Sequence, residues 1–147
     1  GQGEAVAKAI MEMAGLKTPI LVVITGEGGS GGALAIGVGD RILMLENAYY
    51  SVITPEGCAS ILWKDASKAA EAAEVLRLTA DDLLEMQVVD TIIPEPLGGA
   101  HTAPEVMAAN LKRYLLGNLT AILNDDPNDL LARRYQKYRR LGRYLEE

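Results

Sequence analysis

The residues best suited to chemistry are glycines that directly follow a short apolar run. Segment 26–32 contains five glycines in seven residues, and an alanine-rich stretch begins at Ala33. Because glycine has no Cβ, a substrate oxygen can approach the backbone N–H groups of such a turn. At a helix N-terminus these groups lack intrahelical acceptors, and the helix dipole favours negative charge. The segment therefore predicts a backbone oxyanion hole. The simpler alternative is a tight strand-to-helix turn, for which one or two glycines would suffice.

The same glycines match the fingerprint of a dinucleotide-binding turn. Gly26, Gly28 and Gly31 have the G-x-G-x-x-G spacing, and Glu46 lies about where a ribose-binding acid would fall. Only nine residues separate Gly31 from the next strand at Arg41, which is too short for a crossover helix along a sheet. The spacing therefore argues against a bound dinucleotide.

A third match is the G-x-S-x-G nucleophile elbow formed by Gly28, Ser30 and Gly32. Asp90 and His101 follow in the chain order of an α/β-hydrolase. The chain has one histidine, so His101 is the only candidate for the triad base. A serine acyl hydrolase that uses Ser30, Asp90 and His101 is therefore one alternative function, and an inactive structural fragment is another.

Composition excludes several other classes of function. One cysteine, Cys58, and one histidine cannot make a closed tetrahedral zinc site, and the glycine turn lacks the lysine of a P-loop. We therefore expect no metal and no bound nucleotide. The net charge of −6 argues against general affinity for nucleic acid or an anionic membrane. No apolar run approaches the roughly 20 residues of a membrane span, so we expect a cytoplasmic protein.

The elements that position the glycine turn follow from hydrophobic patterning. Segment 19–25 is a continuous β-branched run, typical of a strand covered on both faces of a parallel sheet. Thr54 and Thr79 are predicted helix N-caps, the latter in a capping box with Asp82. Further strands are predicted at 41–45, 49–53 and 88–93, and helices at 4–14, 33–38, from 55, 66–76, 80–86, 103–123 and 127–145. This order predicts an α/β fold, with a core over residues 1–101 and a helical extension over 102–147.

The last predicted helix is basic and aromatic. We expect a solvated face with a docked tyrosine stripe, and the alternative is contact with a partner subunit or with the phosphates of a ligand. Its members are Arg133, Arg134, Lys137, Arg139, Arg140 and Arg143, interleaved with Tyr135, Tyr138 and Tyr144.

Three long segments, 26–40, 50–64 and 92–101, resemble the alpha subunits of bacterial acetyl-CoA carboxylase carboxyltransferases. The resemblance extends from Gly1 to Gln136. It implies a ClpP/crotonase-like spiral, of which this chain is the C-terminal half, followed by a helical extension. It also implies transfer of a carboxyl group from N-carboxybiotin to acetyl-CoA, which yields malonyl-CoA for fatty acid biosynthesis.

The resemblance assigns roles to the glycine turn. It implies that the backbone amides of Gly31 and Gly32 hold the ureido oxygen of biotin. The rest of the implied substrate-binding loop is Gly28, Gly29, Ser30 and Ala33.

The resemblance also implies several partners. Biotin is expected on a biotin carboxyl carrier protein, which an ATP-dependent biotin carboxylase loads. A carboxyltransferase beta subunit is expected to supply the zinc ribbon and most of the acyl-CoA pocket in an alpha2beta2 assembly. Family members are considerably longer than this chain, so we expect activity only with the beta subunit, and either the chain is a fragment or another chain supplies the missing elements.

Overall fold

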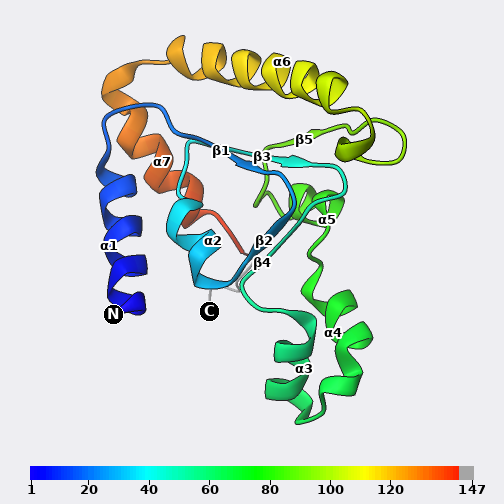
Figure 1. The fold of residues 1–147 in the computed structure, drawn as a ribbon. Coiled ribbons are helices and arrows are strands. Elements are labelled where there is room, and N and C mark those ends of the chain that lie inside the picture. Colours follow the sequence, from blue (N-terminus) through cyan, green and yellow to red (C-terminus); the bar gives the residue numbers. More distant parts are fainter. Residues whose placement is uncertain (143–147) are drawn as a thin grey trace.

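The structure, a computed structural model, describes residues 1–142. Its centre is a three-stranded parallel sheet in the order β1-β3-β5, with β3 in the middle (Figure 1). The strands are β1 (Leu21–Ile24), β3 (Arg41–Leu45) and β5 (Thr91–Ile93). Two shorter strands, β2 (Glu27–Gly29) and β4 (Tyr49–Ser51), pair in parallel as a second sheet.

Two ββα units in succession build the fold. The chain runs from β1 through β2 into α2 (Ser30–Ile36), and from β3 through β4 into α3 (Pro55–Trp63). In each unit the first strand belongs to the larger sheet and the second to the smaller one. The N–H of Tyr49 donates to the carbonyl of Gly26 at 3.1 Å, which ties the two units together where the sheets meet.

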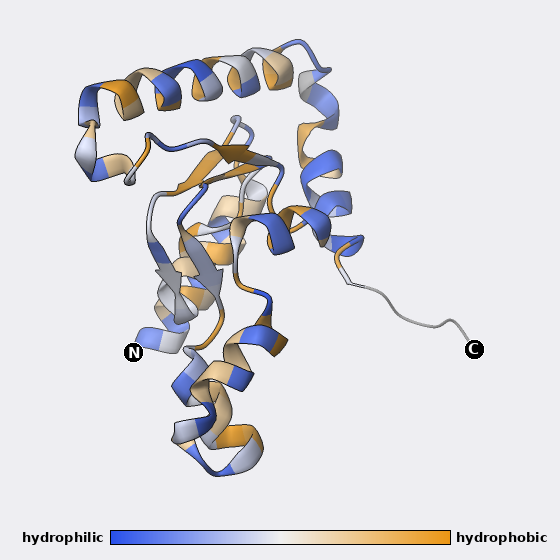
Figure 2. Cartoon of the chain, turned by 90° about the vertical axis from the view of Figure 1, so that its right-hand side faces the viewer, coloured by the Kyte–Doolittle hydropathy of each residue, from blue (hydrophilic) through white to orange (hydrophobic). Residues whose placement is uncertain are grey.

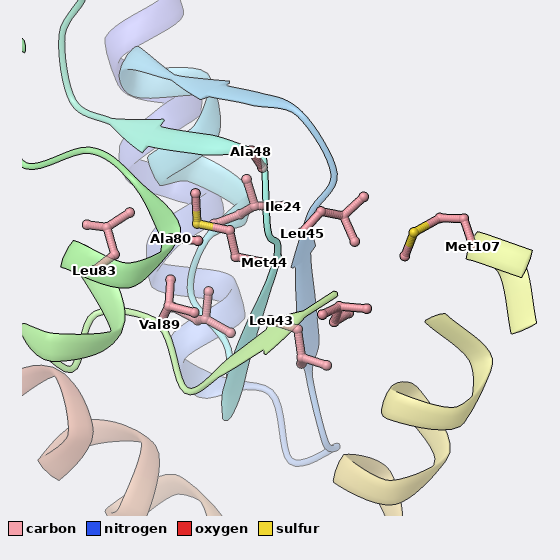
Figure 3. Packing of buried hydrophobic residues seen from close by; sticks show 11 residues of the cluster. Ile24, Leu43, Met44, Leu45, Ala48, Ala80, Leu83, Val89 and Met107 are labelled. Carbon is pink, nitrogen blue, oxygen red and sulfur yellow. The ribbon is translucent and has the colours of Figure 1, made fainter. Parts of the chain in front are cut away.

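The core lies around the central strand. Leu43 and Met44 of β3 are fully buried, and Ile93 of β5 packs in the same cluster. In Figure 3, Met44 points toward Ala80, whereas Leu45 lies on the side of Met107. Helices α5 (Ala80–Glu85) and α6 (Pro104–Leu123) thus cover opposite faces of the sheet. Burial on both faces explains why β3 is a continuous apolar run.

The first strand is less buried than its sequence predicts. Residues 21–23 are half-buried and only Ile24 is buried. The reason is that β1 pairs with β3 alone and forms an edge of the sheet. The continuous apolar pattern therefore predicted the strand correctly but overestimated how deeply its side chains are buried.

The predicted N-caps of α3 and α5 are present. The hydroxyl of Thr54 accepts a hydrogen bond from the N–H of Gly57 at 3.1 Å, and that of Thr79 accepts from Asp82. The other helices are α1 (Gln2–Gly15), η1 (Ala66–Lys68), α4 (Ala69–Leu76), η2 (Ala100–Thr102), η3 (Pro127–Asp129) and α7 (Leu130–Arg139). The helix predicted over 127–145 thus begins as a 3-10 turn and ends at Arg139, and η2 was not predicted.

Helices α3 and α4 form a hairpin that projects from the sheet, at the bottom of Figure 1. Its small core contains Cys58, Ala59 and Ala72. Ile61 is 71% exposed, and the neighbouring Leu62 is also exposed. The hairpin therefore carries an apolar surface that residues 1–142 leave uncovered.

Helix α7 is docked against the sheet rather than solvated along its length. Arg134 is 2% exposed, and its guanidinium donates to both carboxylate oxygens of Asp40 at 2.9 and 2.8 Å. The same guanidinium donates to the carbonyls of Met13, Leu16 and Thr18 at 2.8–2.9 Å. One buried arginine thus joins the end of α1 to the starts of β1 and β3.

The expectation of a solvated basic face is therefore wrong for part of α7. In Figure 2, α7 is mostly hydrophilic in colour, although Arg134, Lys137 and Tyr138 form hydrogen bonds at the amino edge of the sheet. The exposed members are Arg139, Arg140 and Tyr135, and Arg143 and Tyr144 lie outside the described residues. None of the helices within residues 1–142 has the length and apolar content that crossing a membrane requires.

Candidate active site

The glycine turn lies just beyond the carboxyl end of β1. Its first part forms β2, which the sequence analysis missed, and α2 begins at Ser30, three residues before the predicted start. Gly29 is the N-cap of α2 in an extended conformation, and no side chain within residues 1–142 caps this end. Gly31 and Gly32 therefore lie in the first turn, where backbone N–H groups have no intrahelical acceptor.

The glycines of the turn divide into two kinds. A Cβ on Gly28 would lie 2.9 Å from Cδ2 of Tyr50 and 3.2 Å from Cγ2 of Ile24, so packing requires glycine there. Cβ atoms built on Gly29 and Gly32 would meet nothing within 4 Å. Packing within residues 1–142 therefore explains Gly28 and gives no reason for glycine at 29 or 32.

A pocket of about 340 Å³ adjoins the turn. The inner face of α2 supplies Ala33 and Gly37 to its wall, and Gly28 and Gly29 line it from β2. Gly31 faces α1 instead, since its Cβ would lie 3.6 Å from Cγ2 of Val6. The predicted loop residues thus surround the start of α2 on more than one side.

Two tyrosines of β4 lie beside the turn. Tyr49 is in register with Glu27, and Tyr50 with Gly28. Burial, followed by the carboxylate of Glu27, raises the pKa of the Tyr49 hydroxyl, and burial raises the pKa of Tyr50. Both hydroxyls are therefore protonated at neutral pH. The sequence analysis missed Tyr50, because only the pairing of β2 with β4 brings its ring onto Gly28.

The structure does not assemble the hydrolase triad. Asp90 lies at the amino edge of the sheet, where its carboxylate accepts from the N–H of Ile42 at 2.6 Å. His101 lies beyond the carboxyl end of β5, in a separate pocket beside Glu95. Ser30 follows the carboxyl end of β1 and has φ of 59°, a left-handed conformation that also suits a nucleophile elbow. Because β5 separates Asp90 from His101, the aspartate cannot orient that imidazole.

Asp90 and Lys137 belong to a different cavity, at the opposite edge of the sheet. This cavity of about 660 Å³ lies between α7 and the starts of β3 and β5. The ammonium of Lys137 donates to the carboxylate of Asp90, and burial lowers the pKa of Lys137. Within residues 1–142, no group of three or more potential metal-ligating side chains is present.

Solved structures with the same arrangement of elements define the fold class. A Pseudomonas malonate decarboxylase hetero-tetramer in complex with coenzyme A matches with a TM-score of 0.67 at 20% identity, over 93% of this chain and 56% of that chain. Transcarboxylase 12S matches with a TM-score of 0.53 at 21% identity, over 76% of this chain and 21% of that chain. The fold is therefore the crotonase-like α/β fold, as predicted.

Sequence comparison then gives the family. Residues 1–142 match the family described as "Acetyl co-enzyme A carboxylase carboxyltransferase-like". The acetyl-coenzyme A carboxylase carboxyl transferase subunit alpha of Geobacter metallireducens is 57% identical over 146 residues, which cover 99% of this chain and 46% of the relative. That of Coxiella burnetii strain RSA 331 is 59% identical over 142 residues, with 97% and 45% covered. The chain belongs to this family and spans about half the length of these relatives.

Proposed function

We propose that this chain supplies the biotin-binding part of an acetyl-CoA carboxylase carboxyltransferase, which moves a carboxyl group from N-carboxybiotin to acetyl-CoA. The observation that carries the proposal is the uncapped start of α2 behind a glycine turn, in a chain of this family. Gly28, Gly29 and Ala33 line the pocket beside the turn, and Gly31 and Gly32 lie between them in the chain, in the first turn of α2.

Gly31 and Gly32 would hold the ureido oxygen of biotin, with their N–H groups as donors. The residues fit this group because the space beside Gly29 and Gly32 is open, so an oxygen can approach the backbone. Biotin, when bound, supplies the activated carboxyl group. The two amides stabilise negative charge as it develops on the ureido oxygen, which is the usual contribution of an oxyanion hole. Ser30 has no chemical role in this scheme.

A beta subunit and a biotinylated carrier protein are the proposed partners. The apolar surface of the hairpin, with Ile61 and Leu62 exposed, supports a partner, since exposed apolar clusters mark interaction surfaces. The malonate decarboxylase of similar fold is a hetero-tetramer. We therefore expect activity from an assembly and none from this chain alone.

The test is a carboxyl-transfer assay with three samples: the chain, a carboxyltransferase beta subunit, and both together. Consumption of malonyl-CoA with biocytin as carboxyl acceptor should occur with both chains together and with neither alone. If the mixture forms a complex by sedimentation and still shows no transfer, the proposed function is wrong. Release of free carboxylate from acyl esters by the chain alone would favour the hydrolase instead.

A further inference from the structure

The loop that joins α2 to β3 is held by a hydroxyl from α7. Tyr138 Oη accepts a hydrogen bond from the N–H of Gly39 at 2.7 Å and lies 3.0 Å from the carbonyl oxygens of both Gly37 and Gly39. One hydroxyl therefore bonds to backbone on either side of residue 38. Gly37 and Tyr138 are 101 positions apart in sequence, so this contact is a long-range one.

Gly37, which is hydrogen-bonded to Tyr138 through its carbonyl, has no room for a side chain. A Cβ there would lie 2.5 Å from Oη of Tyr50 and 2.9 Å from the carbonyl of Ala33. The ring of Tyr50 in turn packs on Gly28. A continuous series of contacts thus runs from Tyr138 through Gly37 and Tyr50 to the glycine turn, and the last three of these residues line the 340 Å³ pocket.

Helix α2 depends on such contacts for its position. It has seven residues, roughly 10 Å in length at 1.5 Å per residue, and no side chain within residues 1–142 caps its start. Helix α1 packs beside it (Figure 1), and the end of α1 is bound to Arg134 of α7. Helix α7 thus holds α2 directly at its carboxyl end and indirectly along its side.

We propose that Tyr138 is a positioning residue for the glycine-lined pocket, acting through Gly37 on the placement of α2. The hydroxyl touches no substrate and sets where the wall of the pocket lies relative to the turn. This inference rests on the proposed carboxyl transfer at that pocket. Its consequence is that a conservative change on α7 alters turnover at a site to which α7 contributes no lining residue.

The test is Tyr138→Phe in the complete carboxyltransferase, with Tyr135→Phe as the matched control. Tyr135 lies on the same helix and is 62% exposed. Tyr138→Phe should lower kcat about tenfold to a hundredfold, the scale on which small displacements of a site act. The KM for acyl-CoA should stay near that of the parent and the variant should stay folded at the assay temperature, whereas Tyr135→Phe should change neither kcat nor KM.

Amide hydrogen exchange gives a readout that does not depend on activity. Exchange should become faster at residues 30–37 in Tyr138→Phe, while β3 exchanges as in the parent. Gly37→Ala, whose Cβ would lie 2.5 Å from Oη of Tyr50, should displace the same end of α2 and reproduce the faster exchange and the lower kcat.

Two outcomes would overturn the inference. Unchanged kcat in Tyr138→Phe would do so, and so would faster exchange spread equally over β3 with a lower melting temperature, since that pattern marks a purely structural role. An assembled parent without carboxyl transfer would overturn the proposed function itself. In that case exchange at residues 30–37 would still report whether Tyr138 fixes α2, so the two failures can be told apart.

Discussion

The two ends of the strands in the three-stranded sheet, its amino edge and its carboxyl edge, differ in the chemical groups that they present. At the amino edge, charged side chains from α7 and the strand starts pair with one another, as in Arg134 with Asp40 and Lys137 with Asp90. At the carboxyl edge, the glycine turn presents backbone with no side-chain cap within residues 1–142. The difference indicates that the amino edge holds the fold together, whereas the carboxyl edge is where we propose that backbone groups carry out the chemistry.

The buried polar side chains at the amino edge have hydrogen-bond partners. No buried side-chain nitrogen or oxygen within residues 1–142 lacks a hydrogen-bond partner. Asp40 is an example, since its carboxylate accepts hydrogen bonds from Arg134 and from the N–H of Ile20, the latter at 2.7 Å. Substitutions in the buried charged pairs at this edge should therefore act on stability, and substitution of Gly32 in the glycine turn should act on turnover.

The largest expected effect on stability follows from Arg134→Met. Removing the guanidinium leaves the carboxylate of Asp40, whose side chain is 7% exposed, without its cation. Breaking a buried pair in this way costs about 3–5 kcal/mol. The control Arg133→Met removes a more exposed arginine, 3.6 Å from Asp125, and should cost about 0–1 kcal/mol. Urea unfolding of both variants in the same assembly state measures the difference, and equal losses would contradict the account of the amino edge.

A smaller effect on stability should distinguish substitutions at two adjacent glycines of the turn. Gly28→Ala should destabilise by about 1–3 kcal/mol, because its Cβ would overlap the ring of Tyr50. Gly29→Ala has open space and an extended backbone, so it should be neutral or stabilising by up to about 1 kcal/mol. Thermal unfolding of the pair measures this. A larger loss at Gly29 would show that the division of the turn into packed and open glycines is wrong.

The smallest expected effect concerns pH and the cap of α5. Hydrogen bonds from the Thr79 hydroxyl, and then from Arg77, lower the pKa of Asp82. A carboxyl group whose pKa is lower in the folded state stabilises the fold above its unfolded pKa of about 3.9, and the contribution is lost as pH falls through the folded value. Asp82→Asn should therefore lower the urea midpoint at neutral pH, and the gap should close in strong acid. A gap that persists in acid would mean that the side chain acts by packing alone.

Much of the fold could be predicted because local signals agreed with the long-range contacts. The apolar run at 41–45 became β3 with the predicted bounds, and Thr54 caps α3 as expected. The division into a core over 1–101 and an extension over 102–147 stays a prediction. Arg134 shows why α7 could not be placed from sequence, since its partners lie 94 to 121 positions away and leave no periodic signal.

The residues of the candidate site also differ in whether the sequence could predict them. Gly31 and Gly32 could be assigned to a helix start from the glycine turn, because backbone chemistry depends on local sequence. Tyr50 could not be found, since its contact with Gly28 exists only through the pairing of β2 with β4. The assignment of the two amides to the ureido oxygen stays a prediction.

In the proposed function, backbone amides, and not the Ser30 hydroxyl, carry the chemistry of the turn. Gly32→Val should fold, because its Cβ would meet nothing within 4 Å, and it should block the approach of a ligand oxygen. Gly117→Val is the matched control, with equally open space on α6. Ser30→Ala removes the hydroxyl, and Ser30→Gly does so while suiting the left-handed φ of 59°.

The most direct measurement is kcat for carboxyl transfer by each variant in the complete complex, with melting temperature as the check on folding. Gly32→Val should lose about 10²–10³ in kcat, the usual effect of losing one oxyanion donor, and the serine variants and Gly117→Val should keep most of the parent's turnover. If both serine variants are inactive while a folded Gly32→Val retains its turnover, backbone catalysis is contradicted and Ser30 is the nucleophile.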